Sequence, residues 1–277
     1  GIQMFDVSAN GAVIPALGFG TFRMPEADVL RIVPKAIQTG FRHIDTAQIY
    51  DNEAAVGQAI LDSGVPRKDI FLTTKVWVSN YRHDAFVKSV DESLEKLKTD
   101  YVDLLLLHWP NKDVSLADQI GALNEVRQAG KVRHIGVSNF NIALMDEAAA
   151  LSDAPLVTNQ VEYHPFIDQT KVMDVARKHG MALTAYYAMA DGKVLENEQL
   201  GEIAKSHDRS VAQVVLRWLL QQNDVIALSK TATESRVAEN FDIFDFELSG
   251  EEMQAIHGLA DENGRIVSPD GLAPDWD

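Results

Sequence analysis

The strongest constraint on the fold is a regular alternation between short apolar runs and longer segments with the periodicity of amphipathic helices. The apolar runs are rich in β-branched residues or leucine. From the second run to the fifth they recur at intervals of roughly 30 positions, the length of one βαβ unit. This spacing predicts eight strands, which cover residues 17–20, 42–45, 70–75, 102–108, 134–138, 157–162, 182–186 and 225–228.

The segments between the strands are predicted to be helices, because their apolar residues fall three or four positions apart and therefore share one face. Glycine follows three of these segments, at Gly40, Gly130 and Gly180. A left-handed glycine commonly ends a helix at this place. The expected helices cover residues 26–38, 53–61, 85–97, 116–129, 142–150, 170–179, 211–221 and 251–259.

The strand at 102–108 contains four consecutive leucines instead of alternating polar and apolar residues. Both of its faces are therefore expected to be covered, as in a parallel sheet wrapped by helices. Eight such strands predict an α/β fold of the closed (β/α)₈ type, a TIM barrel, as a single domain over residues 1–277. The alternative is an open doubly wound sheet, but Gly18-Phe19-Gly20 lacks the third glycine and the following helix of its phosphate loop.

A β-hairpin is predicted ahead of the first barrel strand. The mostly apolar segment 4–7 and the apolar pair 13–14 flank Asn10-Gly11, a strong signal for a type I′ turn. We expect the hairpin to cap the bottom of the barrel, where it contributes stability, because active sites of such barrels lie at the opposite face.

Composition excludes several classes of function. The 277 residues include 41 acidic and 25 basic side chains, which give a formal net charge of −16. No nucleic-acid or membrane partner is expected, because both need clustered Lys and Arg. The absence of cysteine excludes disulfides and thiol nucleophiles. With no targeting segment, no apolar run of about 18 residues and no long apolar stripe, we expect a soluble, cytoplasmic monomer.

Four polar residues follow the ends of predicted strands and define a candidate catalytic site: Asp45, Tyr50, Lys75 and His108. The carboxyl ends of barrel strands meet at one mouth, so these side chains should converge. An ammonium beside a phenol is expected to lower the pKa of that phenol, and the carboxylate would orient the ammonium. The set suits protonation of a carbonyl oxygen, with the imidazole directing the same oxygen.

No side chain can deliver a hydride, so a cofactor is expected at the mouth. The segment after the last strand carries Lys230, Thr231, Arg236 and Asn240, and phosphate sites commonly follow the seventh and eighth strands of this fold. A metal-dependent hydrolase or isomerase is an alternative, with His43, Asp45 and His108 as ligands. We predict no metal site, because Lys75 beside these residues would repel a cation.

Five motifs, in their order along the chain, resemble those of the aldo-keto reductases, and the resemblance extends over nearly the whole chain. The resemblance implies reduction of an aldehyde or ketone by NADPH. The motifs are Gly40-Phe41-Arg42-His43-Ile44-Asp45-Thr46-Ala47-Gln48-Ile49-Tyr50, Thr73-Thr74-Lys75-Val76-Trp77, Leu106-Leu107-His108-Trp109-Pro110, Gly136-Val137-Ser138-Asn139-Phe140 and Asn159-Gln160-Val161-Glu162-Tyr163-His164-Pro165.

The resemblance also implies residue roles. Tyr50 would be the proton donor, supported by Lys75 and Asp45, and His108 would direct the carbonyl. Trp77 and Trp109 would join Tyr50 and His108 at the substrate. The cofactor would be held by Gly20, Thr21, Asp45, Ser138, Asn139, Gln160 and Tyr186, with Tyr186 stacked on the nicotinamide, and by Lys230, Thr231, Arg236 and Asn240 at the 2′-phosphate and adenine.

Within the family, residues 51–57 and the tail 265–277 look most like bacterial 2,5-diketogluconate reductases of the B type, whose relatives also reduce methylglyoxal. The sequence departs from the family at Ser229, where proline is common, and at 187–192, where many members have a Ser-Pro-Leu-Gly loop. Trp276 in the tail either packs or helps to wall the pocket. A cofactor-bound redox sensor or regulatory subunit with negligible turnover is the alternative to an enzyme.

Overall fold

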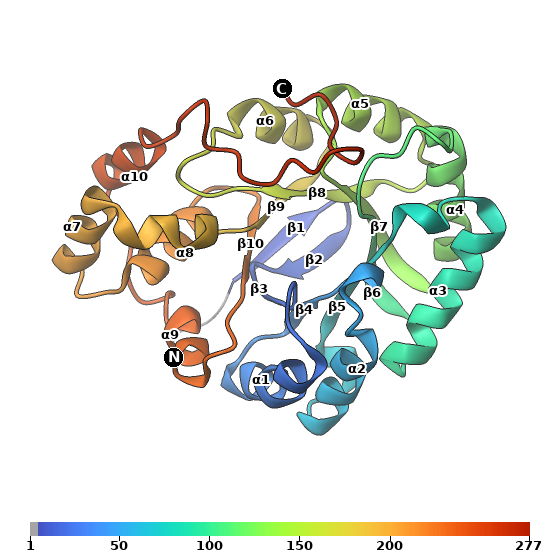
Figure 1. The fold of residues 1–277 in the computed structure, drawn as a ribbon, viewed down its shortest axis with the longest axis horizontal. Coiled ribbons are helices and arrows are strands. Elements are labelled where there is room, and N and C mark those ends of the chain that lie inside the picture. The colour runs from blue at the N-terminus through green and yellow to red at the C-terminus, as the bar shows by residue number, and fades with distance from the viewer. Residues whose placement is uncertain (1–4) are drawn as a thin grey trace.

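A computed structural model describes residues 5–277 as a closed barrel of eight parallel strands surrounded by helices (Figure 1). The strands follow one another around the barrel in chain order, and the last pairs with the first. The predicted (β/α)₈ barrel is therefore confirmed and the open sheet is excluded. The barrel strands are β3 (Leu17–Gly20), β4 (His43–Asp45), β5 (Phe71–Val76), β6 (Val102–Leu107), β7 (Val132–Ser138), β8 (Leu156–Glu162), β9 (Ala182–Tyr186) and β10 (Val225–Ser229).

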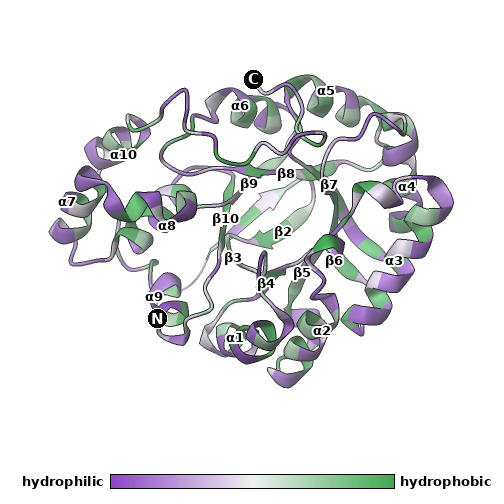
Figure 2. Ribbon diagram, viewed as in Figure 1, coloured by the Kyte–Doolittle hydropathy of each residue, from purple (hydrophilic) through white to green (hydrophobic). Residues whose placement is uncertain are grey.

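Helices connect the strands and cover the outside of the barrel, and hydrophilic residues mark their outer faces (Figure 2). All eight predicted helices are present, with ends shifted by at most two residues. The helices are α1 (Glu26–Thr39), α2 (Glu53–Asp62), α3 (His83–Leu97), α4 (Leu116–Gln128), α5 (Ile142–Leu151), α6 (Thr170–Lys178), α7 (Glu198–Ser206), α8 (Val211–Leu220), α9 (Glu234–Phe241) and α10 (Gly250–His257).

Burial explains why β6 contains four consecutive leucines. The strand pairs with β5 on one side and β7 on the other, and all four leucines are buried. One face of a barrel strand packs against the interior and the other against the helices.

None of the helices between residues 5 and 277 is long and apolar enough to cross a membrane.

The predicted hairpin is present as β1 (Asp6–Ala9) and β2 (Ala12–Pro15). Asn10 and Gly11 both have positive φ, as a type I′ turn requires. The Asn10 side chain donates to the carbonyls of Leu156 and His179, at the amino end of β8 and just before β9. The hairpin therefore closes the bottom of the barrel, as predicted; Met4 lies outside the described residues.

Helices α7 and α9 were not predicted. Only Leu200, Ile203 and Ala204 form the buried face of α7, and only Val237 and Asn240 are buried in α9. A signal was nevertheless present: the Asn197 side chain accepts a hydrogen bond from the backbone N–H of Leu200 and so caps the helix. The predicted helix-ending glycines Gly40, Gly130 and Gly180 all have positive φ.

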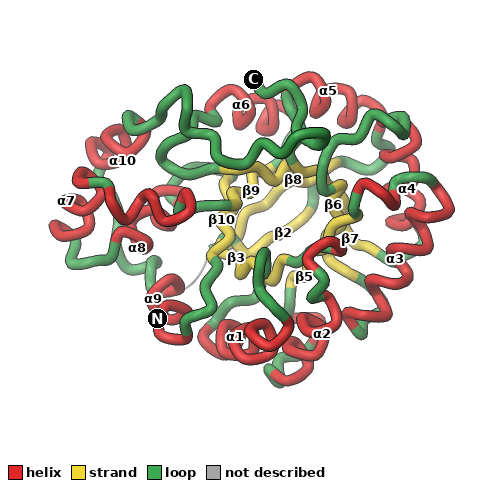
Figure 3. The backbone as a smooth tube through the Cα atoms, in the orientation of Figure 1, coloured by secondary structure: helices red, strands yellow, loops and turns green. Residues whose placement is uncertain are grey.

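The loops at the carboxyl ends of the strands and the segment after α10 form the mouth of the barrel (Figure 3). The segment 258–277, called the tail below, has no helix or strand and crosses the mouth beside β8 and β9. Both the loops and the tail are therefore placed to shape a site at this end.

Substitutions at two glycines can show how closely the outer helices pack. A Cβ on Gly57 in α2 would lie 2.6 Å from the carbonyl oxygen of Leu97, whereas nothing lies within 4 Å of one on Gly121 in α4. We expect Gly57→Ala to lower the free energy of unfolding by about 1–3 kcal/mol. The control Gly121→Ala should raise it by about 0.5–1 kcal/mol. Urea denaturation measures both, and a Gly57→Ala variant as stable as the parent would contradict the close packing.

Candidate active site

A cleft of about 500 Å³ opens at the mouth of the barrel. It contains most of the predicted site residues, from both the catalytic and the cofactor sets. Thr21, Lys75 and Trp77 are not part of its lining. The predicted residues that line it are Gly20, Asp45, Tyr50, His108, Trp109, Ser138, Asn139, Gln160, Tyr186, Lys230, Thr231, Arg236 and Asn240.

The Lys75 ammonium connects two of the other predicted catalytic residues, Asp45 and Tyr50, and does not itself line the cleft. It donates hydrogen bonds to Asp45 Oδ1 at 2.6 Å, to the Thr46 carbonyl at 2.9 Å and to the Tyr50 hydroxyl at 3.2 Å. The Lys75 side chain is wholly buried and Asp45 is 2% exposed. A buried charge is tolerated when it is paired and fully hydrogen-bonded, and these contacts meet both conditions.

Local hydrogen bonds hold the loop that carries Tyr50. The 3₁₀ helix η1 (Gln48–Tyr50) follows β4 directly. The Asn52 side chain accepts from the Thr46 hydroxyl and donates to the carbonyls of Thr21 and Met24. The Tyr50 loop is thereby tied to the neighbouring β3–α1 connection. Sequence analysis did not single out Asn52, although a polar residue directly before a helix start was a usable signal.

Two predicted residues support this arrangement without lining the cleft. The Thr21 hydroxyl donates to the carbonyl of Asp45. The indole of Trp77 packs edge-on against the His108 imidazole, with ring centroids 5.4 Å apart. Both residues thus contact catalytic candidates instead of the open space.

The expected lowering of the Tyr50 pKa is wrong in direction. The nearby Lys75 ammonium does act to lower the pKa of the phenol, but burial has the larger effect and raises it above its ordinary value. Burial also acts to lower the pKa of Lys75, yet Asp45 and Tyr50 together outweigh it, so that pKa is raised. At neutral pH Tyr50 is therefore a protonated phenol beside a charged ammonium.

His108 faces Tyr50 across the site, with ring centroids 5.7 Å apart. Burial, and secondarily the charge on Lys75, hold the pKa of the imidazole well below its ordinary value. Its Nδ1 is buried with no hydrogen-bond partner among the described residues. A neutral imidazole has one N–H donor, which suits a hydrogen bond to a carbonyl oxygen.

The residues predicted to hold the nicotinamide hydrogen-bond with one another at the carboxyl ends of β7, β8 and β9. Gln160 donates to Asp45 Oδ2 at 2.9 Å, and the Tyr186 hydroxyl donates to Asn139 Oδ1 at 2.7 Å. The Ser138 hydroxyl donates to the carbonyl of Gln160. These contacts connect the wall of the cleft directly to the Asp45–Lys75 pair.

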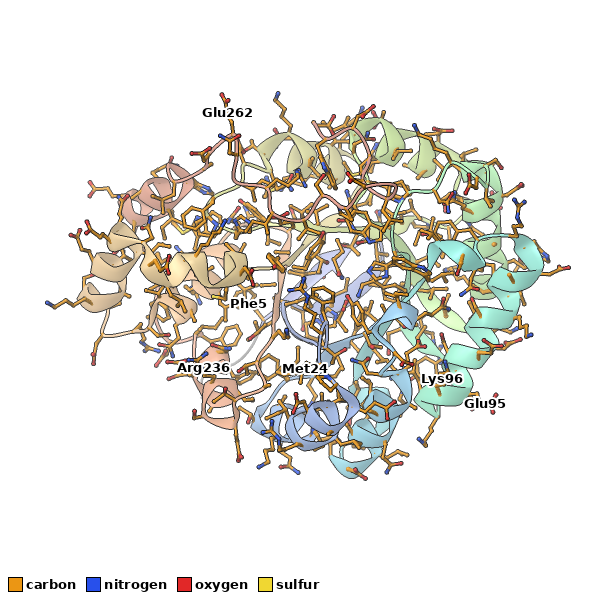
Figure 4. The ribbon with its side chains drawn as sticks, viewed as in Figure 1. Phe5, Met24, Glu95, Lys96, Arg236 and Glu262 are labelled. Carbon is orange, nitrogen blue, oxygen red and sulfur yellow. The ribbon has the colours of Figure 1, made fainter. Side chains whose placement is uncertain are left out.

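The far end of the cleft has the donors that a phosphorylated cofactor needs. Lys230, Arg236 and Arg23 all line it, and burial followed by the charge on Arg23 lowers the pKa of Lys230. Ser229 Oγ and Asn240 Oδ1 are buried without a partner among the described residues. Figure 4 labels Arg236 on α9 and Met24 on the β3–α1 connection; both line the cleft. Cations beside unsatisfied polar atoms fit a ligand that bears phosphate and hydrogen-bonding groups.

The tryptophans differ in their places. Trp109 is buried and lines the cleft, and its ring meets that of Trp276 edge-on, with centroids 6.4 Å apart. Trp276 packs against Trp109 but is not itself a lining residue. In the part of the chain from residue 5 onward, no three His, Asp or Glu side chains group closely enough to hold a metal ion.

The fold and the site together define a (β/α)₈ barrel with a phenol, an ammonium and a carboxylate in contact at its mouth. The sequence model described as "Aldo/keto reductase family" matches residues 16–261. The chain therefore belongs to the aldo/keto reductase family of oxidoreductases.

Individual proteins of this family are similar to the chain over almost its whole length. Methylglyoxal reductase DkgB of Escherichia coli O157:H7 is 45% identical over 267 residues, covering 95% of this chain and 99% of that protein. A crystal structure provisionally assigned as a 2,5-diketo-D-gluconic acid reductase B has a TM-score of 0.98 at 69% identity and covers 99% of this chain and 98% of that chain. A Bombyx mori aldo-keto reductase in complex with NADP has a TM-score of 0.88 at 32% identity, with 94% of each chain covered.

The lowered pKa of His108 predicts a pH-dependent stability. Below about pH 6.5 the unfolded chain binds a proton that the buried imidazole does not, so the free energy of unfolding should decrease as the pH falls, by up to about 1.4 kcal/mol per pH unit. Above that pH the imidazole is neutral in both states and contributes no slope. His108→Gln should reduce the slope between about pH 6.5 and 5, measured by urea denaturation. An unchanged slope would contradict a buried neutral histidine.

Proposed function

We propose that this aldo-keto reductase uses NADPH to reduce a small dicarbonyl or keto-sugar acid, such as methylglyoxal or 2,5-diketogluconate, to the alcohol, with Tyr50 as the proton donor. The observation that carries the proposal is the Tyr50 hydroxyl, which lines a cleft continuous with Lys230 and Arg236 while Lys75 contacts it at 3.2 Å from below.

The chain's own residues account for the proton transfer. Lys75 donates to the Tyr50 oxygen, so the phenol proton remains free to pass to a substrate oxygen. As Tyr50 loses that proton, the adjacent ammonium stabilises the phenolate. Asp45 keeps Lys75 charged, and neutral His108 offers an N–H that would orient the same carbonyl.

NADPH, when bound, supplies the hydride that adds to the carbonyl carbon. The residues fit such a cofactor through the cations and unsatisfied polar atoms at the far end of the cleft. Lys230, Thr231, Arg236 and Asn240 would hold the 2′-phosphate and adenine, and Ser138, Asn139, Gln160 and Tyr186 the nicotinamide. NADP in the complexed Bombyx mori relative supports this choice.

The substrate class rests on the names of the similar proteins and on the shape of the mouth. Phe22 packs against the ring of the proton donor Tyr50, with centroids 5.4 Å apart, and Trp109 and Val267 of the tail also line the cleft. Aromatic walls around one polar centre favour a compact carbonyl compound. A monomeric state, a cytoplasmic location and a single domain over 1–277 stay predictions.

Replacing the proton donor gives a direct test. Purified wild-type protein should oxidise NADPH only when methylglyoxal, 2,5-diketogluconate or a simple aromatic aldehyde is present. Tyr50→Phe should bind NADPH as tightly as the wild type and lower turnover by at least about 100-fold, since it removes the general acid. The loss of NADPH absorbance measures turnover, and fluorescence titration measures binding. Retained turnover in Tyr50→Phe would exclude Tyr50 as the donor, and wild-type binding without turnover would favour a sensor.

Arg236 should discriminate between the two nicotinamide cofactors. Arg236→Ala is expected to weaken NADPH about 10- to 100-fold, the scale of a hydrogen bond to a charged group, and to change NADH much less. Arg177→Ala is a control, because Arg177 bonds to Asn223 and Asp224, outside the cleft. Equal losses for both cofactors would remove the 2′-phosphate role.

A further inference from the structure

A buried carboxylate at the end of β8 binds the backbone of the tail. Glu162 Oε1 accepts from the N–H of Val267 at 2.8 Å, and Oε2 accepts from the N–H of Ile266 at 2.9 Å. The Glu162 side chain has no exposed surface. Nothing in the proton transfer described above uses this group, yet it belongs to the Asn159–Pro165 motif.

His164 completes the hydrogen bonding of this carboxylate. Its Nδ1 accepts from the N–H of Phe166 at 3.2 Å, which leaves the proton on Nε2, and Nε2 lies 2.7 Å from Glu162 Oε2. Glu162 thus receives two backbone N–H groups and one imidazole N–H. A buried carboxylate is stable with such a donor set, and each donor would be left unsatisfied without it.

The tail follows a close path on either side of this anchor. A Cβ on Gly264 would collide with the carbonyl oxygen of Phe166, and the N–H of Asp261 donates to that same oxygen at 3.0 Å. Beyond the anchor, the Trp276 indole donates to the Ser268 hydroxyl at 3.0 Å, and the Arg265 guanidinium lies 3.6 Å from the centre of the Trp276 ring. The tail is therefore fixed from both directions.

The anchored segment reaches the cleft through a single residue, Val267. The tail approaches beside β8 and β9, whereas the cofactor-binding candidates of α9 lie across the mouth (Figures 1 and 4, where Glu262 and Arg236 mark the two sides). A change in the position of Val267 would thus alter this wall of the cleft and leave Lys230 and Arg236 in place.

We propose that Glu162 is a positioning residue for substrate selection, which holds the backbone of Ile266 and Val267 so that Val267 forms a fixed wall of the cleft. The inference rests on the proposed carbonyl reductase function. It assigns to the buried Glu162–His164 pair a role in the choice among carbonyl compounds and none in the proton transfer itself.

The test uses Glu162→Gln in the full-length enzyme. The amide keeps the shape of the side chain, but its NH₂ group meets at least one of the three donors and cannot accept from it. Hydrogen exchange at the amides of residues 266 and 267 should become about tenfold faster or more, as expected for a lost hydrogen bond. Asp168→Asn is the matched control, because Asp168 accepts from Thr170 in the same β8–α6 connection and does not contact the tail.

Kinetics with two substrates of different size separate a positioning role from a purely structural one. If the wall becomes mobile, KM should rise more for methylglyoxal, the smaller substrate, than for 4-nitrobenzaldehyde. The larger aldehyde gains room when Val267 can move. The ratio of the two kcat/KM values should shift by about fivefold or more, within the range of pocket contacts. The Kd of NADPH should stay within about twofold, because Lys230 and Arg236 lie on a different stretch of chain from the tail. Tyr186 is the strand partner of Glu162, but its hydroxyl bonds to Asn139 and not to the carboxylate that is changed.

Each other outcome counts against a defined part of the inference. Unchanged exchange at 266 and 267 in folded Glu162→Gln would overturn the anchor, and faster exchange with an unchanged substrate ratio would overturn the role in selection. A wild-type enzyme that reduces none of methylglyoxal, 2,5-diketogluconate and 4-nitrobenzaldehyde would overturn the proposed function itself. If Glu162→Gln does not fold, Val267→Ala replaces it: the wall is then removed with the anchor intact, and an unshifted substrate ratio overturns the inference.

Discussion

The site depends on one buried ion pair, between the Lys75 ammonium and the Asp45 carboxylate, 2.6 Å apart. Each charge is shielded from solvent and is stabilised by its partner. Removal of either partner from such a pair lowers the free energy of unfolding by on the order of 3–5 kcal/mol. The pair joins neighbouring strands β4 and β5, and Gln160 reaches Asp45 from β8 on the other side of the barrel. Closure of the barrel is thus a condition for assembling the charges.

Burial of this pair also sets the protonation state of the phenol above it. In water an ammonium would favour the phenolate, but at this site desolvation penalises the charged phenolate more than Lys75 stabilises it. Tyr50 therefore remains an acid at neutral pH. The ammonium becomes most useful when negative charge develops on the phenol oxygen, which is when an acid catalyst needs stabilisation.

Local patterns were sufficient for the strands, most helices and the hairpin, because each depends on residues close in sequence. The convergence of Asp45, Tyr50 and Lys75 was also predictable, because the carboxyl ends of parallel strands meet at one mouth. The sign of the Tyr50 pKa shift was not, since it depends on how completely the packed side chains exclude water. The contact between Glu162 and Ile266 spans 104 positions, and neither residue has a local signal for the other.

The segment after β10, which carries Lys230 and the Arg236 of α9, and the tail, which carries Val267, are separate stretches of chain that line one opening. Neither contributes a strand to the barrel. The barrel and its buried charges can therefore stay constant while either stretch accumulates substitutions. In this architecture substitutions in the tail can change substrate specificity while cofactor binding is retained, because the two kinds of recognition reside in different segments of the same chain.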